Sequence, residues 1–209
     1  ELNDYKLPIK TFLGIDIGSV STNLVLIDCE GNVLKEIYLR TKGRPIEVVN
    51  DGLKEIHAEF HNMIQICGVG TTGSGRELIG ELVGADYIID EITSHKTGSQ
   101  FISTKMMNEN VDTIFEIGGQ DSKFINLDNE IVIDFTMNEA CAAGTGSFLE
   151  EQAERLGISI KGEFAELAFT SKNPIIMGER CTVFIEHDII GYQQKGAKKE
   201  DLIAGLAYS

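Results

Sequence analysis

Two isolated cysteines are the residues of this sequence best suited to redox or metal chemistry. Cys141 lies in "NEACAAGTGSFLEEQAERLG" and Cys181 in "MGERCTVFIEHDII", and neither has a second cysteine close enough for a local CxxC metal site. The pattern after Cys141 predicts a short glycine-rich turn and then a helix, whose partially positive N-terminus would stabilise a thiolate or an anionic metal cluster. Arg180 could act in the same way on Cys181. The alternative is that both thiols are buried structural residues, the usual state of a lone cysteine.

Two thiolates are too few for an iron–sulfur cluster, which usually takes four. A symmetric homodimer removes this difficulty, because each subunit would supply two cysteines to one cluster on the twofold axis. The other two cysteines, Cys29 and Cys67, lie on or beside apolar strands. We therefore predict that they are core residues.

A glycine turn in "GIDIGSVSTN" is suited to binding phosphate. A buried strand ends at Asp16 and is followed by Gly18, so the backbone can approach a phosphate without a Cβ in the way. Asp16 could hold Mg²⁺, which prefers carboxylate oxygen. Hydroxyl groups that could donate to phosphate oxygens follow at Ser19, Ser21 and Thr22. An ordinary tight β-turn explains the segment equally well.

A second turn of the same kind lies in "EIGGQDSK". Gly118 and Gly119 permit close approach to phosphate, and Ser122 offers a hydroxyl. Gln120 could orient a water molecule at the γ-phosphate, and Asp121 could hold metal or polarise that water. Neither turn is a P-loop, because no G-x-x-x-x-G-K-[ST] occurs in the sequence. A third glycine-rich segment, "GVGTTGSG", could also face phosphate, but we interpret it as a connector.

The two turns belong to an internal repeat. Subtracting 100 from the residue numbers of "TIFEIGGQDSKFINLDNEIVI" aligns it with "FLGIDIGSVSTNLVLIDCEGNVL", so that Gly118 corresponds to Gly18. Each copy predicts an apolar strand, a glycine turn, a second strand and a hairpin. Helical patterns follow each copy. The sequence therefore predicts an α/β fold with two related half-domains, at residues 11–108 and 111–209.

The bulk composition is that of a globular protein. The 209 residues are 42% hydrophobic and 24% charged, and the net charge of -15 argues against sequence-independent binding to nucleic acid or to an anionic membrane. No apolar run approaches the ~20 residues of a membrane helix, and the polar first residues do not form a signal peptide. Four cysteines do not make a disulfide framework in a chain of this length, so we expect a cytoplasmic protein.

Together, these segments resemble the ATPase activators of 2-hydroxyacyl-CoA dehydratases and the related ATPase subunits of benzoyl-CoA reductase. The resemblance covers the chain from Phe12 on, and its motifs are "GIDIGSVSTNLVLI", "GTTGSGRELI", "DEITSHKTG", "IGGQDSK", "NEACAAGTGSFLE" and "GERCTVF". That family belongs to the superfamily of sugar kinases, actin and heat-shock ATPases. The resemblance thus implies two ribonuclease-H-like halves around a nucleotide cleft, in agreement with the internal repeat.

The same resemblance implies a function. Cys141 and Cys181 from each of two subunits would hold one 4Fe-4S cluster, with the helix after Cys141 directed at it. Hydrolysis of MgATP to ADP would change the angle between the subunits. That change would drive a low-potential electron from the cluster into a partner 2-hydroxyacyl-CoA dehydratase or a related CoA-ester reductase. Reduced ferredoxin or flavodoxin would reload the activator.

Two departures from the family pattern add to these expectations. The adenine-binding element of the superfamily, a late Gly-Gly turn and its helix, would follow Ser209, and Asn23 stands where many members of the family have Lys. We therefore expect the 209 residues to be part of a longer activator, with a second half that is incomplete at its C-terminal end. In a tandem activator, the second pair of cluster cysteines would come from a sister domain instead of an identical subunit.

Two other classes of function stay open from the residues alone. A small-molecule kinase of the same fold, acting on a sugar or a carboxylate, would need a carboxylate base beside the acceptor hydroxyl. The candidates for that base are Asp86, Asp90 and Glu91, and none is convincing. A non-enzymatic, actin-like scaffold would have both cysteines in its core, but the intact polar residues of the two turns argue against it.

Overall fold

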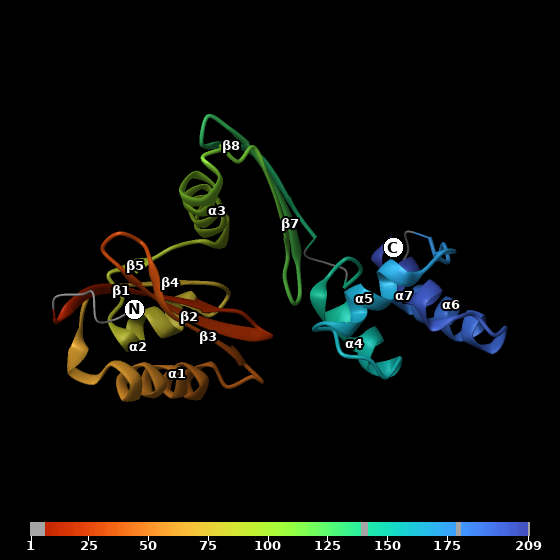
Figure 1. The fold of residues 1–209 in the computed structure, drawn as a ribbon, viewed down its shortest axis with the longest axis horizontal. Coiled ribbons are helices and arrows are strands. Elements are labelled where there is room, and N and C mark those ends of the chain that lie inside the picture. The colour runs from red at the N-terminus through yellow and green to blue at the C-terminus, as the bar shows by residue number, and fades with distance from the viewer. Residues whose placement is uncertain (1–6, 139–141, 179–180, 209) are drawn as a thin grey trace. The chain divides into compact units, whose positions relative to one another are not determined.

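The computed structural model of the protein describes residues 7–138, 142–178 and 181–208. The chain divides into two compact units, Glu1–Val111 and Asp112–Ser209 (Figure 1). Each unit contains one copy of the sequence repeat, and each copy forms three consecutive antiparallel strands. Within the described ranges, no helix is long and apolar enough to cross a membrane.

The first unit is built on a five-stranded mixed sheet with the strand order β3-β2-β1-β4-β5. Strand β2 runs antiparallel to β1 and β3, whereas β4 runs parallel to β1 and β5 runs parallel to β4. This is the order and direction of a ribonuclease-H-like sheet, as the resemblance implied. The strands are β1 (Ile9–Ile17), β2 (Ser21–Asp28), β3 (Val33–Arg40), β4 (Ile64–Thr72) and β5 (Tyr87–Ile88).

Helices cover both faces of this sheet. Figure 1 shows α1 and α2 on one face and α3 on the other. Proline at the first helical position fits the start of α1, and Gly84, with φ of 65°, ends α2 in the left-handed conformation. The helices are α1 (Pro45–Phe60), the short 3-10 helix η2 (His61–Met63), α2 (Arg76–Val83) and α3 (Glu91–Met107).

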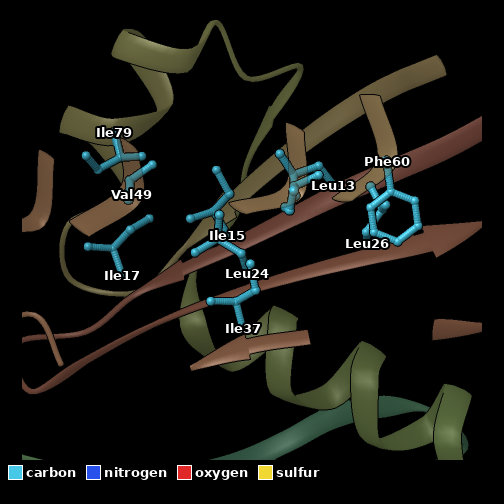
Figure 2. Close-up of a cluster of buried hydrophobic side chains, with 10 residues drawn as sticks. Leu13, Ile15, Ile17, Leu24, Leu26, Ile37, Val49, Phe60 and Ile79 are labelled. Atoms are coloured by element: carbon cyan, nitrogen blue, oxygen red, sulfur yellow. The ribbon is translucent and has the colours of Figure 1, made fainter. Parts of the chain in front are cut away.

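The core of the first unit lies between the sheet and the helices α1 and α2. Buried and more exposed residues alternate along β1 and β2, so that every second side chain points to this side. Ile17 lies near Val49 and Ile79, and Phe60 lies beside Leu26 (Figure 2). A slip of one residue would expose the whole buried row, so this packing fixes the register and therefore the position at which β1 ends.

In its described residues, the second unit combines a three-stranded antiparallel sheet, in the order β6-β7-β8, with four helices. The helices share one apolar core, which includes Phe148, Ile185 and Ile203. The strands are β6 (Thr113–Ile117), β7 (Ser122–Asp128) and β8 (Ile131–Met137), and the helices are α4 (Gly146–Arg155), α5 (Glu163–Thr170), α6 (Thr182–Gln194) and α7 (Lys199–Ala207).

The prediction that Cys29 and Cys67 are core residues is wrong, because both thiols are exposed. Cys29 lies beyond the end of β2, in the turn that leads to β3. The register between β1 and β4 shifts so that Thr11 pairs with Ile66 but Phe12 pairs with Gly68. Cys67 is therefore the extra residue of a β-bulge, which interrupts the alternation that the sequence pattern assumed.

We expect Gly205→Ala to destabilise the second unit. A Cβ on Gly205 would overlap the carbonyl oxygen of Ile175 and lie 2.9 Å from Cε of Met177, in the buried part of α7. Overpacking of this kind costs about 1–3 kcal/mol, and more where backbone must move. Urea denaturation measures the loss. Gly191→Ala, inside α6, is the matched control because, apart from the neighbouring residues and the backbone of α6 itself, no described atom lies within 4 Å of its Cβ position. It should be neutral or stabilising.

Candidate nucleotide and cluster sites

The first glycine turn joins β1 to β2 and is closed by a backbone hydrogen bond. The amide of Gly18 donates to the carbonyl oxygen of Ser21 at 2.8 Å. A Cβ on Gly18 would lie 3.0 Å from that oxygen, so the close backbone approach favours glycine. The amide of Gly18 thus holds the turn instead of facing a ligand. Ser19 is exposed, and Ser21 is partly buried.

The second turn, between β6 and β7, repeats this geometry. The amide of Gly118 donates to the carbonyl oxygen of Asp121 at 2.9 Å, and a Cβ on Gly118 would lie 2.8 Å from Oε1 of Glu116. Gln120 is exposed in the turn, whereas Asp121 and Ser122 are partly buried. The same backbone bond at corresponding positions shows that the repeat seen in the sequence is also a repeat of structure.

Thr22 supports the first turn from the inside. Its side chain is fully buried, and its hydroxyl lies 2.9 Å from the hydroxyl of Thr41. The Thr41 hydroxyl in turn donates to the carbonyl oxygen of Gly18 at 2.8 Å. The direct phosphate contact expected for Thr22 is therefore incompatible with its burial, and Thr22 stabilises the turn instead.

Each unit pairs an acidic residue near the end of its first strand with a donor near the start of its second strand. In the first unit Asp16 faces Asn23, whose Nδ2 donates to Oδ2 of Asp16 at 3.2 Å. In the second unit Glu116 faces Lys123, and Nζ of Lys123 lies 2.9 Å from Oε2 of Glu116. Asn23 brings no charge to its carboxylate, whereas Lys123 brings a full positive charge to its own.

The "GTTGSG" segment packs directly on the first turn. The amide of Gly75 donates to the carbonyl oxygen of Ile17 at 2.9 Å, and Ser74 donates its hydroxyl to the same oxygen at 3.3 Å. A Cβ on Gly73 would lie 2.6 Å from Oδ1 of Asp16. This segment, which we interpreted as a connector, is therefore part of the immediate surroundings of Asp16.

The N-terminus of α4 packs on the second turn in a related way. The amide of Gly146 donates to the carbonyl oxygen of Gly118 at 2.7 Å, and the amide of Ser147 donates to that of Gly119 at 3.1 Å. A Cβ on Gly146 would lie 3.0 Å from the Gly118 oxygen. Cys141, the first predicted cluster ligand, lies outside the described residues. The segment that follows it leads to Gly146 and Ser147, the first two residues of α4. Their amides donate to the carbonyl oxygens of the second turn.

Cys181, the second predicted cluster ligand, is exposed and forms the N-cap of α6. Its carbonyl oxygen accepts from the amides of Phe184 at 2.9 Å and Ile185 at 3.3 Å. Within the described part of the chain, its side chain makes no capping hydrogen bond. Burial in the core, the alternative for this cysteine, is therefore excluded. The thiol lies at the positive end of a helix, where an anionic group is favoured.

Comparison with known proteins agrees with these features. Residues 13–209 match the model of the BadF/BadG/BcrA/BcrD ATPase family. The chain belongs to this ATPase family. It is 34% identical over 197 residues to the (R)-2-hydroxyglutaryl-CoA dehydratase activating ATPase of Acidaminococcus fermentans, covering 93% of this chain and 72% of that protein. It is 38% identical over 200 residues to the uncharacterized protein MJ0800 of Methanocaldococcus jannaschii, covering 94% of this chain and 47% of that relative, about half its length.

Two solved structures, one of a dehydratase component and one of a dehydratase activator, have the same fold. The Acidaminococcus fermentans (R)-2-hydroxyglutaryl-CoA dehydratase component A superposes with a TM-score of 0.82 at 31% identity, over 94% of this chain and 73% of that one. The activator of the 2-hydroxyisocaproyl-CoA dehydratase from Clostridium difficile, with bound ADPNP, gives a TM-score of 0.80 at 30% identity, over 94% and 70%. These matches confirm the predicted α/β fold class and the resemblance to dehydratase activators.

A cavity of about 410 Å³ lies in the first unit of this BadF/BadG/BcrA/BcrD ATPase, beside Asp16. Its wall includes Gly14 and Gly70 from the sheet and Gly98 from α3. Ser94 of α3 donates its hydroxyl to the Thr72 hydroxyl at 2.9 Å. Among the described residues that line the cavity, Asp16 is the only carboxylate.

Two of the three candidate kinase bases have structural roles in this ATPase. Oδ2 of Asp86 accepts from the amide of Val69 at 2.8 Å. Asp90 is the N-cap of α3 and accepts from the amide of Thr93 at 2.9 Å and from its hydroxyl at 2.7 Å. Glu91 lies in the first turn of α3. Asp86 and Asp90 therefore stabilise the local fold through these hydrogen bonds.

The Asp90 cap predicts a stability that depends on pH. The bonds from the amide and then the hydroxyl of Thr93 hold the pKa of Asp90 below its ordinary value of 3.8. The stabilisation is therefore complete above that value and is lost as the pH falls through the lower pKa of the folded state. Asp90→Ala should cost about 1 kcal/mol at neutral pH, and this difference should shrink in acid. Urea denaturation across the acid range checks it, and Asp90→Asn, a good neutral cap, should retain most of the stability.

Proposed function

We propose that this chain is the ATP-hydrolysing and cluster-binding part of an activator that delivers low-potential electrons to a 2-hydroxyacyl-CoA dehydratase or a related CoA-ester reductase. The observation that carries the proposal is the pair of hydrogen bonds from Gly146 and Ser147 to the carbonyl oxygens of Gly118 and Gly119. They connect the second turn to the segment that contains Cys141. Movement of this turn when the γ-phosphate leaves would therefore reach a cluster ligand through the backbone.

The two turns would divide the work of ATP hydrolysis. Asp16 would hold Mg²⁺, directly or through water, and glycine at position 73 leaves room beside its Oδ1. Gln120, exposed in the second turn, would orient the attacking water, and Asp121 would polarise that water or hold metal. The residues that we propose for phosphate binding are Gly18, Ser19 and Ser21 in the first turn and Gly118, Gly119 and Ser122 in the second.

The cysteines would bind a 4Fe-4S cluster, which supplies a carrier for one low-potential electron when it is bound. Cys181 fits this role because its thiol is exposed at the positive end of α6. The described residues contain no group of three or more His, Cys, Asp and Glu side chains that could hold a metal ion. Because such a cluster usually takes four thiolates, the proposal collects Cys141 and Cys181 from each of two copies, which are either identical subunits or sister domains of a tandem activator.

The partner is inferred from the relatives. Both activators described above serve, by name, the dehydratase of a 2-hydroxyacyl-CoA. We extend this to the present chain: hydrolysis would change the angle between the two copies, the electron would pass to the CoA-ester enzyme, and ferredoxin or flavodoxin would reload the cluster. A cytoplasmic location is part of the same proposal.

The test uses the full-length protein after anaerobic reconstitution with iron and sulfide. We expect MgATP hydrolysis and about four irons per two cluster-binding copies. We also expect an EPR signal after reduction with dithionite. A colourless protein without iron would contradict the electron-transfer function. ATP consumption that depends on an added sugar or carboxylate would favour the kinase.

A further inference from the structure

A buried lysine lies beside the second turn and has no place in the function described so far. The side chain of Lys123 is 2% exposed, and its Nζ lies 2.7 Å from Oδ1 of Asp121 and 2.9 Å from Oε2 of Glu116. Lys123 is the last residue of "IGGQDSK" and lies on β7, directly opposite Glu116 on β6. The sheet register therefore fixes the position of its backbone.

We infer that Lys123 is a positioning residue that holds the carboxylate of Asp121 in one orientation for ATP hydrolysis. A buried ammonium needs negative partners, and here two carboxylates supply them. Asp121 itself is 31% exposed and lies in a turn, so its side chain would have several rotamers without a bound partner. The bond to Nζ fixes Oδ1, and Oδ2 is then held at a defined position.

The first turn shows why this charge matters. Asn23 occupies the position that corresponds to Lys123, and Asp16 occupies the position that corresponds to Glu116. A carboxylate beside a neutral amide suits a cation, whereas an ammonium held between two carboxylates opposes binding of a second cation. Lys123 thus decides between the two roles left open for Asp121, which we assign to water and not to the cation.

This inference rests on the proposed ATP hydrolysis, and its test begins with Lys123→Gln in the full-length protein. The expected result is a fall of about 10–100-fold in kcat, as for other residues that orient a reacting group. Nucleotide affinity should change by less than about twofold, because the lost interaction acts on the reaction and not on binding. An equal loss of affinity and of kcat would overturn the positioning role.

Lys35 provides a matched control in the first unit. It too is an ammonium between two carboxylates, with Nζ 2.8 Å from Glu55 and 2.7 Å from Glu59, but it lies on the surface between β3 and α1. Lys35→Gln should leave kcat unchanged. A similar fall of kcat in both variants would mean that loss of any such ion pair lowers activity, and would overturn the inference.

A double substitution separates action through Asp121 from an independent effect. In an Asp121→Asn background, Lys123→Gln should reduce kcat no further, because the group that it positions has already gone. A full additional loss would overturn the inference, whereas wild-type kcat in Asp121→Asn alone would overturn the role of Asp121 itself. If Lys123→Gln does not fold, the double variant Glu116→Gln/Lys123→Gln removes one negative and one positive charge together. Its kcat is then compared with and without Asp121→Asn in the same way.

Discussion

Replacing Cys181 by alanine is expected to remove the iron from the reconstituted full-length protein. The thiol is exposed at the N-cap of α6, so its loss leaves a cluster with fewer than the four thiolates that it usually needs. Iron content should fall from about four atoms per two copies of the chain towards zero. The EPR signal of the reduced protein should disappear. Cys141→Ala should have the same effect.

The other two cysteines supply the controls for this experiment. Cys29 and Cys67 are also exposed, but they lie in the first unit, one in a turn and one in a β-bulge. Alanine at either position should leave iron content and the EPR signal unchanged. Iron that persists in Cys181→Ala, or that falls equally in all four variants, would contradict the cluster assignment.

Asp16→Asn is expected to abolish most ATP hydrolysis. The carboxylate lies at the end of β1 beside the glycine segment that packs on the first turn. An amide oxygen carries no net charge, so Mg²⁺ would lose its carboxylate ligand and would no longer be held where it neutralises the developing charge of the transition state. We expect kcat to fall on the order of 10²- to 10³-fold, with a higher Mg²⁺ concentration needed for half-maximal rate.

Asp51→Asn is a suitable comparison for that loss. Asp51 is 69% exposed on α1, where it forms a long ion pair of 3.5 Å with Lys54, and surface pairs of this kind contribute little to stability. Its substitution should change neither kcat nor the Mg²⁺ dependence. An Asp16→Asn protein with a wild-type rate at the same Mg²⁺ concentration would remove Asp16 from the catalytic site.

The sequence alone determined the repeat and, through it, the geometry of both turns. Apolar alternation along two neighbouring strands fixes their register, because a slip of one residue would expose the buried row. Gly18 and Gly118 therefore hold corresponding places, and each closes its turn with the same backbone hydrogen bond. The same local register places Asp16 opposite Asn23 and Glu116 opposite Lys123.

The sequence did not reveal features that depend on pairing between distant segments. The bulge that exposes Cys67 exists only in the pairing of β4 with β1. Thr22 supports the first turn because Thr41, which lies after β3, contacts its hydroxyl and donates to the carbonyl oxygen of Gly18. For α6, which begins after Cys181, the sequence contains only a weak sign of a helix. Ile185 and Ile189 lie four residues apart, and both are buried in the structure.

Only the tertiary structure decided how the two glycine turns are connected to the rest of each unit. Glycines at positions 73 and 75 lie against the end of β1, and Gly146 and Ser147 bind the carbonyl oxygens of the second turn. These bonds join residues far apart in sequence, and the loss of chain entropy that they require is offset only when whole sheets and helices pack together. Local patterns therefore identified the turns, and packing determined which segments they touch.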